Sequence, residues 1–214
     1  MLPELTNEIY PGLTSDEIWN KVLQVINDRY INEEEQIQLK IQYFSGLIKS
    51  NLLPAIQELT RIYNVNYETE QRCTCFLGFF NPFPRDVILK EFCIHYDVSD
   101  EVFLRSSIHE INHMMLFDKC KEMHGYSNNV EPSYPDVLWY LEELAIEPTL
   151  NDSRIQNIIP IRHDAYESFK NIIIEGSSLT YHIQDIYNRS ECIEEFLDSA
   201  YAFVEQNKSI IIID

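Results

Sequence analysis

The sequence predicts an α+β fold that is mainly helical and carries a small antiparallel or mixed sheet. Apolar residues recur at spacings of three and four along most of the chain, which indicates helices. Near the middle, residues 72–80 and 86–97 are rich in β-branched and aromatic residues and predict strands. Hydrophobic residues make up 45% of the 214 residues and only five are glycine, so we expect a single domain with a buried core and no flexible linker.

Residues 1–63 are expected to form a helical N-terminal subdomain. Its first helix starts with a capping box, since Thr14 can cap the helix and Glu17 follows three residues later. A second helix is predicted in NEEEQIQLKIQYFSGLIKS, whose acidic start suits the helix dipole. A third is predicted in LLPAIQELTRIYN, which has a proline near its first turn.

Residues 64–150 are expected to form the core of the domain. The two strands, RCTCFLGFF and DVILKEFCIHYD, are interpreted as antiparallel neighbours separated by the turn-like NPFPRD. One face of the second strand would carry Ile88, Phe92, Ile94 and Tyr96. Ser99 and Gly125 predict the start and the end of the next helix.

Another helix, DVLWYLEELAIEP, is expected to end at Pro148. Residues 151–214 then begin with an irregular stretch and continue as C-terminal helices. The three predicted helices are HDAYESFKNIIIEG, SSLTYHIQDIYNRS and ECIEEFLDSAYAFVEQN.

Composition excludes several classes of function. The formal net charge of −19 repels phosphate backbones, so we expect no nucleic-acid partner. No apolar run approaches the roughly 20 residues that span a bilayer, so we expect no membrane partner. The start lacks the pattern of a signal peptide, and five scattered cysteines fit reduced thiols in a cytoplasmic protein. We interpret Cys73 and Cys75 as small buried side chains on a strand.

The motif that carries chemistry is HEINH, residues 109–113, which matches H-E-x-x-H. A helix advances about 3.6 residues per turn, so His109 and His113 would project from one face and both could reach one Zn²⁺. Glu110 would lie beside the metal, where a carboxylate can take a proton from water. The alternative is a pair of histidines buried in the core. The uncharged neighbours favour the metal site: Ile108, Ile111, Asn112, Met114 and Met115.

Residues 109–145 resemble the zincin metallopeptidases, and among them the gluzincins, in which a downstream glutamate is the third zinc ligand. The segment LWYLEELA is similar to the LWLxEGLA element of many of these enzymes. On this match Glu142 falls on the ligand glutamate and Glu143 replaces the usual glycine. The metzincin pattern fails because His124 lies too far along the chain, and we interpret His124 as a surface residue.

The choice between the two glutamates is also argued from helical geometry. Adjacent residues on a helix point about 100° apart, so only one glutamate can face the metal. Glu142 lies at the edge of the apolar stripe formed by Leu138, Leu141, Leu144 and Ala145, which favours Glu142. The alternative is Glu143 as ligand, with Glu147 orienting a histidine.

The resemblance implies a zincin-like fold and a zinc metallopeptidase acting on a peptide or protein substrate. Zinc held by His109, His113 and Glu142 would polarise the scissile carbonyl, with Glu110 as general base. The segment DVILKEFCIHYD would bind substrate as an edge strand, and either His163 or Tyr166 could stabilise the oxyanion. Two alternatives stay open: a catalytically silent zincin scaffold that regulates or binds partners, and a metal-free helical structural protein.

Overall fold

The computed structural model describes residues 14–65, 73–79, 85–125 and 131–212. The first element is one continuous helix, α2 (Ser15–Leu47), and not the two helices expected for this stretch. No glycine or proline lies between Ser15 and Tyr43, so nothing in the backbone interrupts the helix near Tyr30. The capping box is confirmed: the Thr14 side chain accepts from the backbone N–H of Glu17, and the Glu17 carboxylate accepts from the backbone N–H of Thr14.

A π-helical turn, η1 (Ile48–Leu52), joins α2 to α3 (Leu53–Tyr63). The proline lies in the first turn of α3, as predicted. Asn64 ends the helix in the left-handed conformation with φ 50°. The end of α2 is fixed to the core by stacking of the Phe44 and Phe103 rings, whose centroids lie 4.0 Å apart. The described part of the N-terminal third, residues 14–65, is thus helical.

The main sheet has three strands in the order β1 (Thr74–Gly78), β3 (Glu91–His95), β2 (Arg85–Asp86). The expected antiparallel pairing of the two predicted strands is wrong, because β1 and β3 are parallel. The chain instead reverses between β2 and β3, where Asp86 accepts the backbone N–H groups of Ile88 and Leu89. Ile88 therefore lies in a turn and is exposed, whereas Phe92, Ile94 and Tyr96 are buried as expected.

The two longest helices of the second half form the centre of the fold. Helix α4 (Asp100–His124) is capped by Ser99 and ended by Gly125, at φ 63°, as predicted. Helix α5 (Val137–Leu150) runs through Pro148 and ends two residues later than expected. Pro148 has no N–H to donate and its ring crowds the carbonyl four residues earlier, yet the last turn still closes, since the backbone N–H of Asn151 bonds to the carbonyl of Glu147.

The C-terminal third is less helical than expected. It contains α6 (Ser153–Gln156), α7 (Glu167–Asn171), β4 (Ile173–Ile174), β5 (Ser177–Ser178), α8 (Leu179–Arg189), α9 (Ile193–Gln206) and α10 (Lys208–Ile211). The first of the three predicted helices shrinks to the five residues of α7, because the chain then turns at Gly176, φ 85°, into an antiparallel hairpin of β4 and β5. The stretch expected to be irregular holds the short α6.

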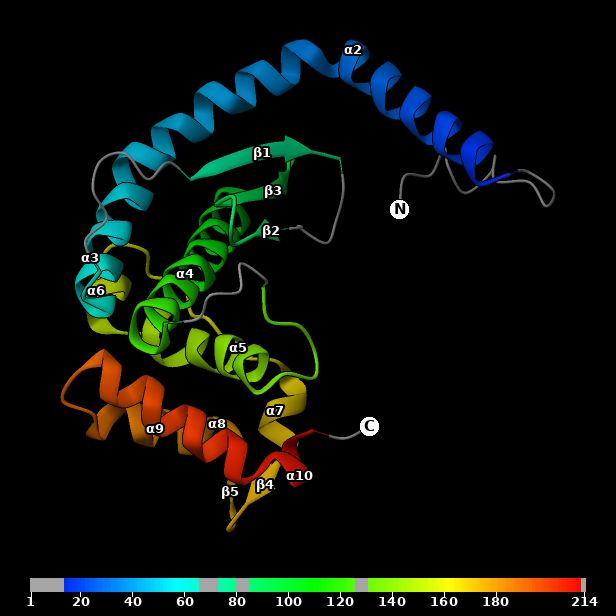
Figure 1. The fold of residues 1–214 in the computed structure, drawn as a ribbon. Helices are drawn as coiled ribbons and strands as arrows, with labels where there is room; N and C mark the ends of the chain where they lie inside the picture. Colours follow the sequence, from blue (N-terminus) through cyan, green and yellow to red (C-terminus); the bar gives the residue numbers. More distant parts are fainter. Residues whose placement is uncertain (1–13, 66–72, 80–84, 126–130, 213–214) are drawn as a thin grey trace.

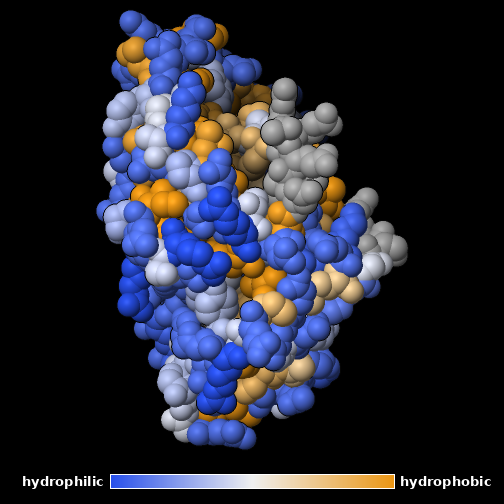
Figure 2. Space-filling model, turned by 90° about the vertical axis from the view of Figure 1, so that its left-hand side faces the viewer, coloured by the Kyte–Doolittle hydropathy of each residue, from blue (hydrophilic) through white to orange (hydrophobic). Residues whose placement is uncertain are grey.

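The elements stack in layers (Figure 1). Helix α2 passes over the sheet, α4 lies beneath it, α5 packs on α4, and α8 and α9 pack on α5. One cluster of buried hydrophobic residues extends from Phe44 to Ile211. In the space-filling view, hydrophobic patches alternate with hydrophilic side chains over the face shown (Figure 2). Across the described segments, no helix has both the length and the apolar character needed to cross a membrane. The fold thus places α4, with its motif, in the middle of the molecule.

All five cysteines are free. Cys75 is partly buried on β1, whereas Cys73, just before the strand, is exposed, so the expectation of a buried pair is wrong for Cys73. The cause is its position at the start of an outer strand of the sheet.

Candidate metal centre

The two motif histidines lie on α4, one turn apart, as the spacing predicts. Their Nε2 atoms are 3.0 Å from each other. His113 is fully buried, and its Nδ1 atom has no hydrogen-bond partner among the residues that the structure describes. The Nε2 atoms of both rings converge on one point between α4 and its neighbours.

Glu143 reaches the same point from α5. Its Oε1 atom lies 3.7 Å from Nε2 of His113. One ligating atom each from His109, His113 and Glu143 lie within 4.8 Å of one another. Two imidazoles and a carboxylate are a ligand set that suits Zn²⁺.

Glu142, the ligand favoured by the sequence argument, is not in this group of three. Its carboxyl group is fully buried, and neither oxygen has a hydrogen-bond partner within the described part of the chain. Burial raises its pKa to about 8. The structure thus brings Glu143, rather than Glu142, to the two histidines.

The protonation states also fit a metal centre. Burial lowers the pKa of His109 to about 3 and that of His113 well below its ordinary value, so both rings are neutral near pH 7. A neutral imidazole offers a lone pair to a metal ion, whereas a protonated one does not. The convergent Nε2 atoms are consistent with histidines arranged as ligands.

Glu110 lies next to the three converging groups. It is 8% exposed, and its Oε2 atom accepts no hydrogen bond from any described residue. Burial raises its pKa to about 7, and the nearby charge of Arg85 counteracts this shift. A carboxyl group with a pKa near 7 can both accept and release a proton at neutral pH.

Arg85 is the site residue that sequence reasoning missed. Its guanidinium lies 3.5 Å from the Glu110 carboxylate, 3.7 Å from Glu142 and 3.8 Å from Glu143, and it donates to Glu131 at 2.8 Å. Arg85 therefore compensates part of the negative charge around the candidate centre. The stretch NPFPRD gives no indication of this role. The contacts of Arg85 with the glutamates of α4 and α5 form only when β2 is in its place in the fold.

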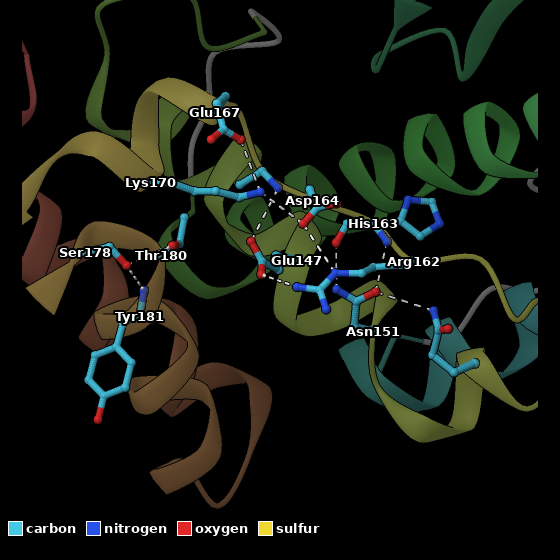
Figure 3. A network of polar contacts seen from close by, with 12 residues as sticks. Glu147, Asn151, Arg162, His163, Asp164, Glu167, Lys170, Ser178, Thr180 and Tyr181 are labelled. Atoms are coloured by element: carbon cyan, nitrogen blue, oxygen red, sulfur yellow. Dashed lines mark hydrogen bonds and ion pairs between the residues drawn. The ribbon is translucent and has the colours of Figure 1, made fainter.

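His163 faces the motif helix from the segment after α6. It is 3% exposed, and burial lowers its pKa to about 4. The side chain of Asn151 fixes this segment: it accepts from the backbone N–H of His163 at 2.9 Å and donates to its carbonyl at 2.6 Å (Figure 3). The Nε2 atom of His163 finds no partner in the described ranges. The sequence left His163 open as an oxyanion donor, and the structure puts it beside His109 and Glu110 in one pocket.

Tyr166, the other residue considered for that role, is more exposed. Its ring stacks on Trp139 with centroids 6.1 Å apart, and its side chain is 52% exposed. Burial raises its pKa, and the charges of Glu143 and Glu110 act on it as well, so it lies at the rim of the centre. His124 is exposed at the end of α4, as expected.

The expectation that residues 86–97 form an edge strand is wrong. Strand β3 is central, with β1 along one side and β2 beside Glu91 and Phe92 on the other.

The arrangement can hold a divalent metal with a titratable carboxyl group on one side and a neutral histidine on the other. Comparisons of the chain with family models, with curated proteins and with solved structures gave no match.

Proposed function

We propose that this protein is a zinc-dependent hydrolase and that it acts as a metallopeptidase on peptide or protein substrates. The observation that carries the proposal is the convergence of His109, His113 and Glu143, with Glu110 beside them. A buried i, i+4 histidine pair alone would fit a structural role. A third ligand from another helix and a carboxyl group with a pKa near 7 support chemistry.

In this proposal the third ligand is Glu143. Glu142 and Glu143 both belong to α5 and both are buried, but only Glu143 has an oxygen near Nε2 of His113. Glu142 would instead remain a protonated acid beside Arg85, because its pKa of about 8 keeps the proton at neutral pH.

The side chains around the ligands have distinct tasks. A bound Zn²⁺ would supply Lewis-acid polarisation of the substrate carbonyl and would lower the pKa of water. Glu110 would accept the proton of the attacking water and pass it to the leaving amine. His163, neutral and with an unsatisfied Nε2 atom, would donate a hydrogen bond to the developing oxyanion in the tautomer that carries the proton on Nε2. Arg85 would limit repulsion among the surrounding carboxylates.

A peptide library tests the proposal. Purified protein would be treated with a chelator, reloaded with zinc or left metal-free, and incubated with a mixture of synthetic peptides that mass spectrometry follows. We expect new termini only in the zinc-loaded sample. The His113→Ala variant should give none, and an exposed control on α4, Glu122→Gln, should cleave like the unmodified protein. Equal cleavage with and without zinc, or none at all by a zinc-loaded chain, would overturn the proposal.

A further inference from the structure

A pocket of about 300 Å³ opens beside the candidate centre. One wall is a face of α4 that carries Arg105, Ser106, His109 and Glu110. The other wall is the segment of Arg162, His163 and Asp164. Since His109 and Glu110 belong to the proposed reaction centre, a substrate residue next to the cleaved bond would enter this pocket.

The charge of this pocket differs from the rest of the surface. The whole chain has 16 basic and 35 acidic residues, yet the seven residues that line the pocket include two arginines and two acidic residues, so its charges are balanced. The side chain of Arg105 is 49% exposed and that of Arg162 is 73% exposed, so both guanidinium groups stand at the mouth in contact with solvent. Guanidinium groups in such positions favour planar anions such as carboxylates.

The acidic groups of the pocket are already engaged. Asp164 accepts from Lys170 at 3.2 Å and lies 3.3 Å from the guanidinium of Arg162 (Figure 3). Glu110 faces Arg85. The arginines also pair with carboxylates, but their guanidinium groups stay exposed: Arg105 contacts only the exposed Glu101 among described carboxylates, one helical turn away, and Arg162 contacts Asp164 at 3.3 Å and Glu147 at 3.6 Å. A substrate carboxylate that enters the pocket would replace these ion-pair partners of Arg105 and Arg162, because ion pairs of exposed side chains contribute little to stability.

The position of the second wall is also well defined. The Asn151 side chain forms hydrogen bonds with both the backbone N–H and the carbonyl of His163. The carboxylate of Glu147 accepts a hydrogen bond from the backbone N–H of Ala165 at 3.5 Å (Figure 3). Arg105 lies close enough to His163 to lower its pKa. The two arginines therefore reach the pocket from opposite walls, and the backbone of the second wall is held by Asn151 and Glu147.

We infer that this pocket binds a carboxylate of the substrate, supplied either by an acidic side chain or by a free C-terminus, and that Arg105 and Arg162 select it. This inference rests on the proposed function, because it names the substrate class of the same site. It makes the two arginines determinants of specificity; neither takes part in the chemical step.

Binding of peptide hydroxamates tests the inference without turnover. A hydroxamate anchors on zinc, and two such peptides would differ only in Glu or Gln at the neighbouring residue. A second pair would carry a free or an amidated C-terminus, which separates the two sources of the carboxylate. Calorimetry on the zinc-loaded protein should give roughly fivefold tighter binding of the charged member of one pair, as about 1 kcal/mol for exposed pairs implies.

Two variants complete the design. In the double variant Arg105→Gln and Arg162→Gln, the preference should fall below about twofold, and added salt should weaken it in the unmodified protein. Arg189→Gln is the matched control, since Arg189 is also exposed and also pairs with a carboxylate one turn earlier, Asp185. Equal binding of charged and neutral members, or a preference that survives in the double variant, would overturn the inference while leaving the metal centre intact. Binding of no hydroxamate at all would overturn the metal centre and the inference together.

Discussion

Glu143 on α5 places its Oε1 atom 3.7 Å from Nε2 of His113 on α4. The two residues are 30 positions apart in the chain, and only the packing of α5 on α4 brings them together. The candidate centre is therefore a product of the helix–helix interface and not of the motif alone.

Glu143→Ala should weaken zinc binding by a factor of ten or more, whereas Glu142→Ala should retain most of the affinity. The reason is that only Glu143 shares the group of converging ligand atoms, and loss of one of three protein ligands removes a direct metal bond. Competition with a chromogenic chelator measures both affinities. The reverse order, with loss in Glu142→Ala and retention in Glu143→Ala, would restore Glu142 as the ligand.

Glu110→Gln should keep the metal and lose hydrolysis by about 10²- to 10⁴-fold. The amide preserves the shape of the side chain, which is nearly buried, but it cannot accept a proton. Zinc content and turnover of a cleaved library peptide are the two readouts. If the variant turned over at a near-normal rate, Glu110 would have no part in the proton transfer.

Asn151→Ala should lower stability by roughly 2 kcal/mol and slow turnover without releasing zinc. Two hydrogen bonds to the backbone of His163 disappear in this variant. Asn151 is thus a positioning residue for His163. Asn188→Ala is a suitable control, because Asn188 is exposed on α8 and should change stability by less than about 0.5 kcal/mol. Chemical denaturation and metal analysis measure the effects, and unchanged kcat in Asn151→Ala would argue against a positioned His163.

The metal-free protein should lose stability as the pH falls from 6.5 toward 4, in part through His163. Burial lowers the pKa of His163 from 6.5 to about 4. Between these values the unfolded chain binds a proton that the folded chain does not, so acid favours unfolding by up to about 3 kcal/mol from this residue. His163→Leu should be less sensitive over this range. Parallel denaturation curves at several pH values test this, and identical pH dependence of both proteins would contradict a buried neutral His163.

Local features of the helices were predictable from the sequence. Thr14 and Glu17, Ser99 and Gly125 act through contacts within one turn of the chain, so their roles could be recognised without knowing the fold. The same holds for the spacing of His109 and His113. The parallel pairing of β1 with β3 was not predictable in this way, because it depends on β2, a two-residue strand that precedes β3 in the sequence and reverses the chain into it.

The choice of Glu142 over Glu143 rested on an apolar stripe along α5. That argument assumes a helix with one buried face. Both glutamates are buried, together with Tyr140, Leu141, Leu144, Ala145 and Ile146. Helical periodicity cannot separate two positions on a helix that is covered nearly all round. The contact with α4 makes the distinction, and no pattern within α5 carries that information.

Zinc stoichiometry is the most direct test of the central claim. The chain, purified without a metal-affinity tag and dialysed against buffer containing zinc and then against buffer without it, would be measured by mass spectrometry of metals. The unmodified protein should retain about one zinc per chain, as a site with three protein ligands implies, and the double variant His109→Ala and His113→Ala should retain almost none. A zinc content near zero in the folded, unmodified protein after this treatment would contradict the account.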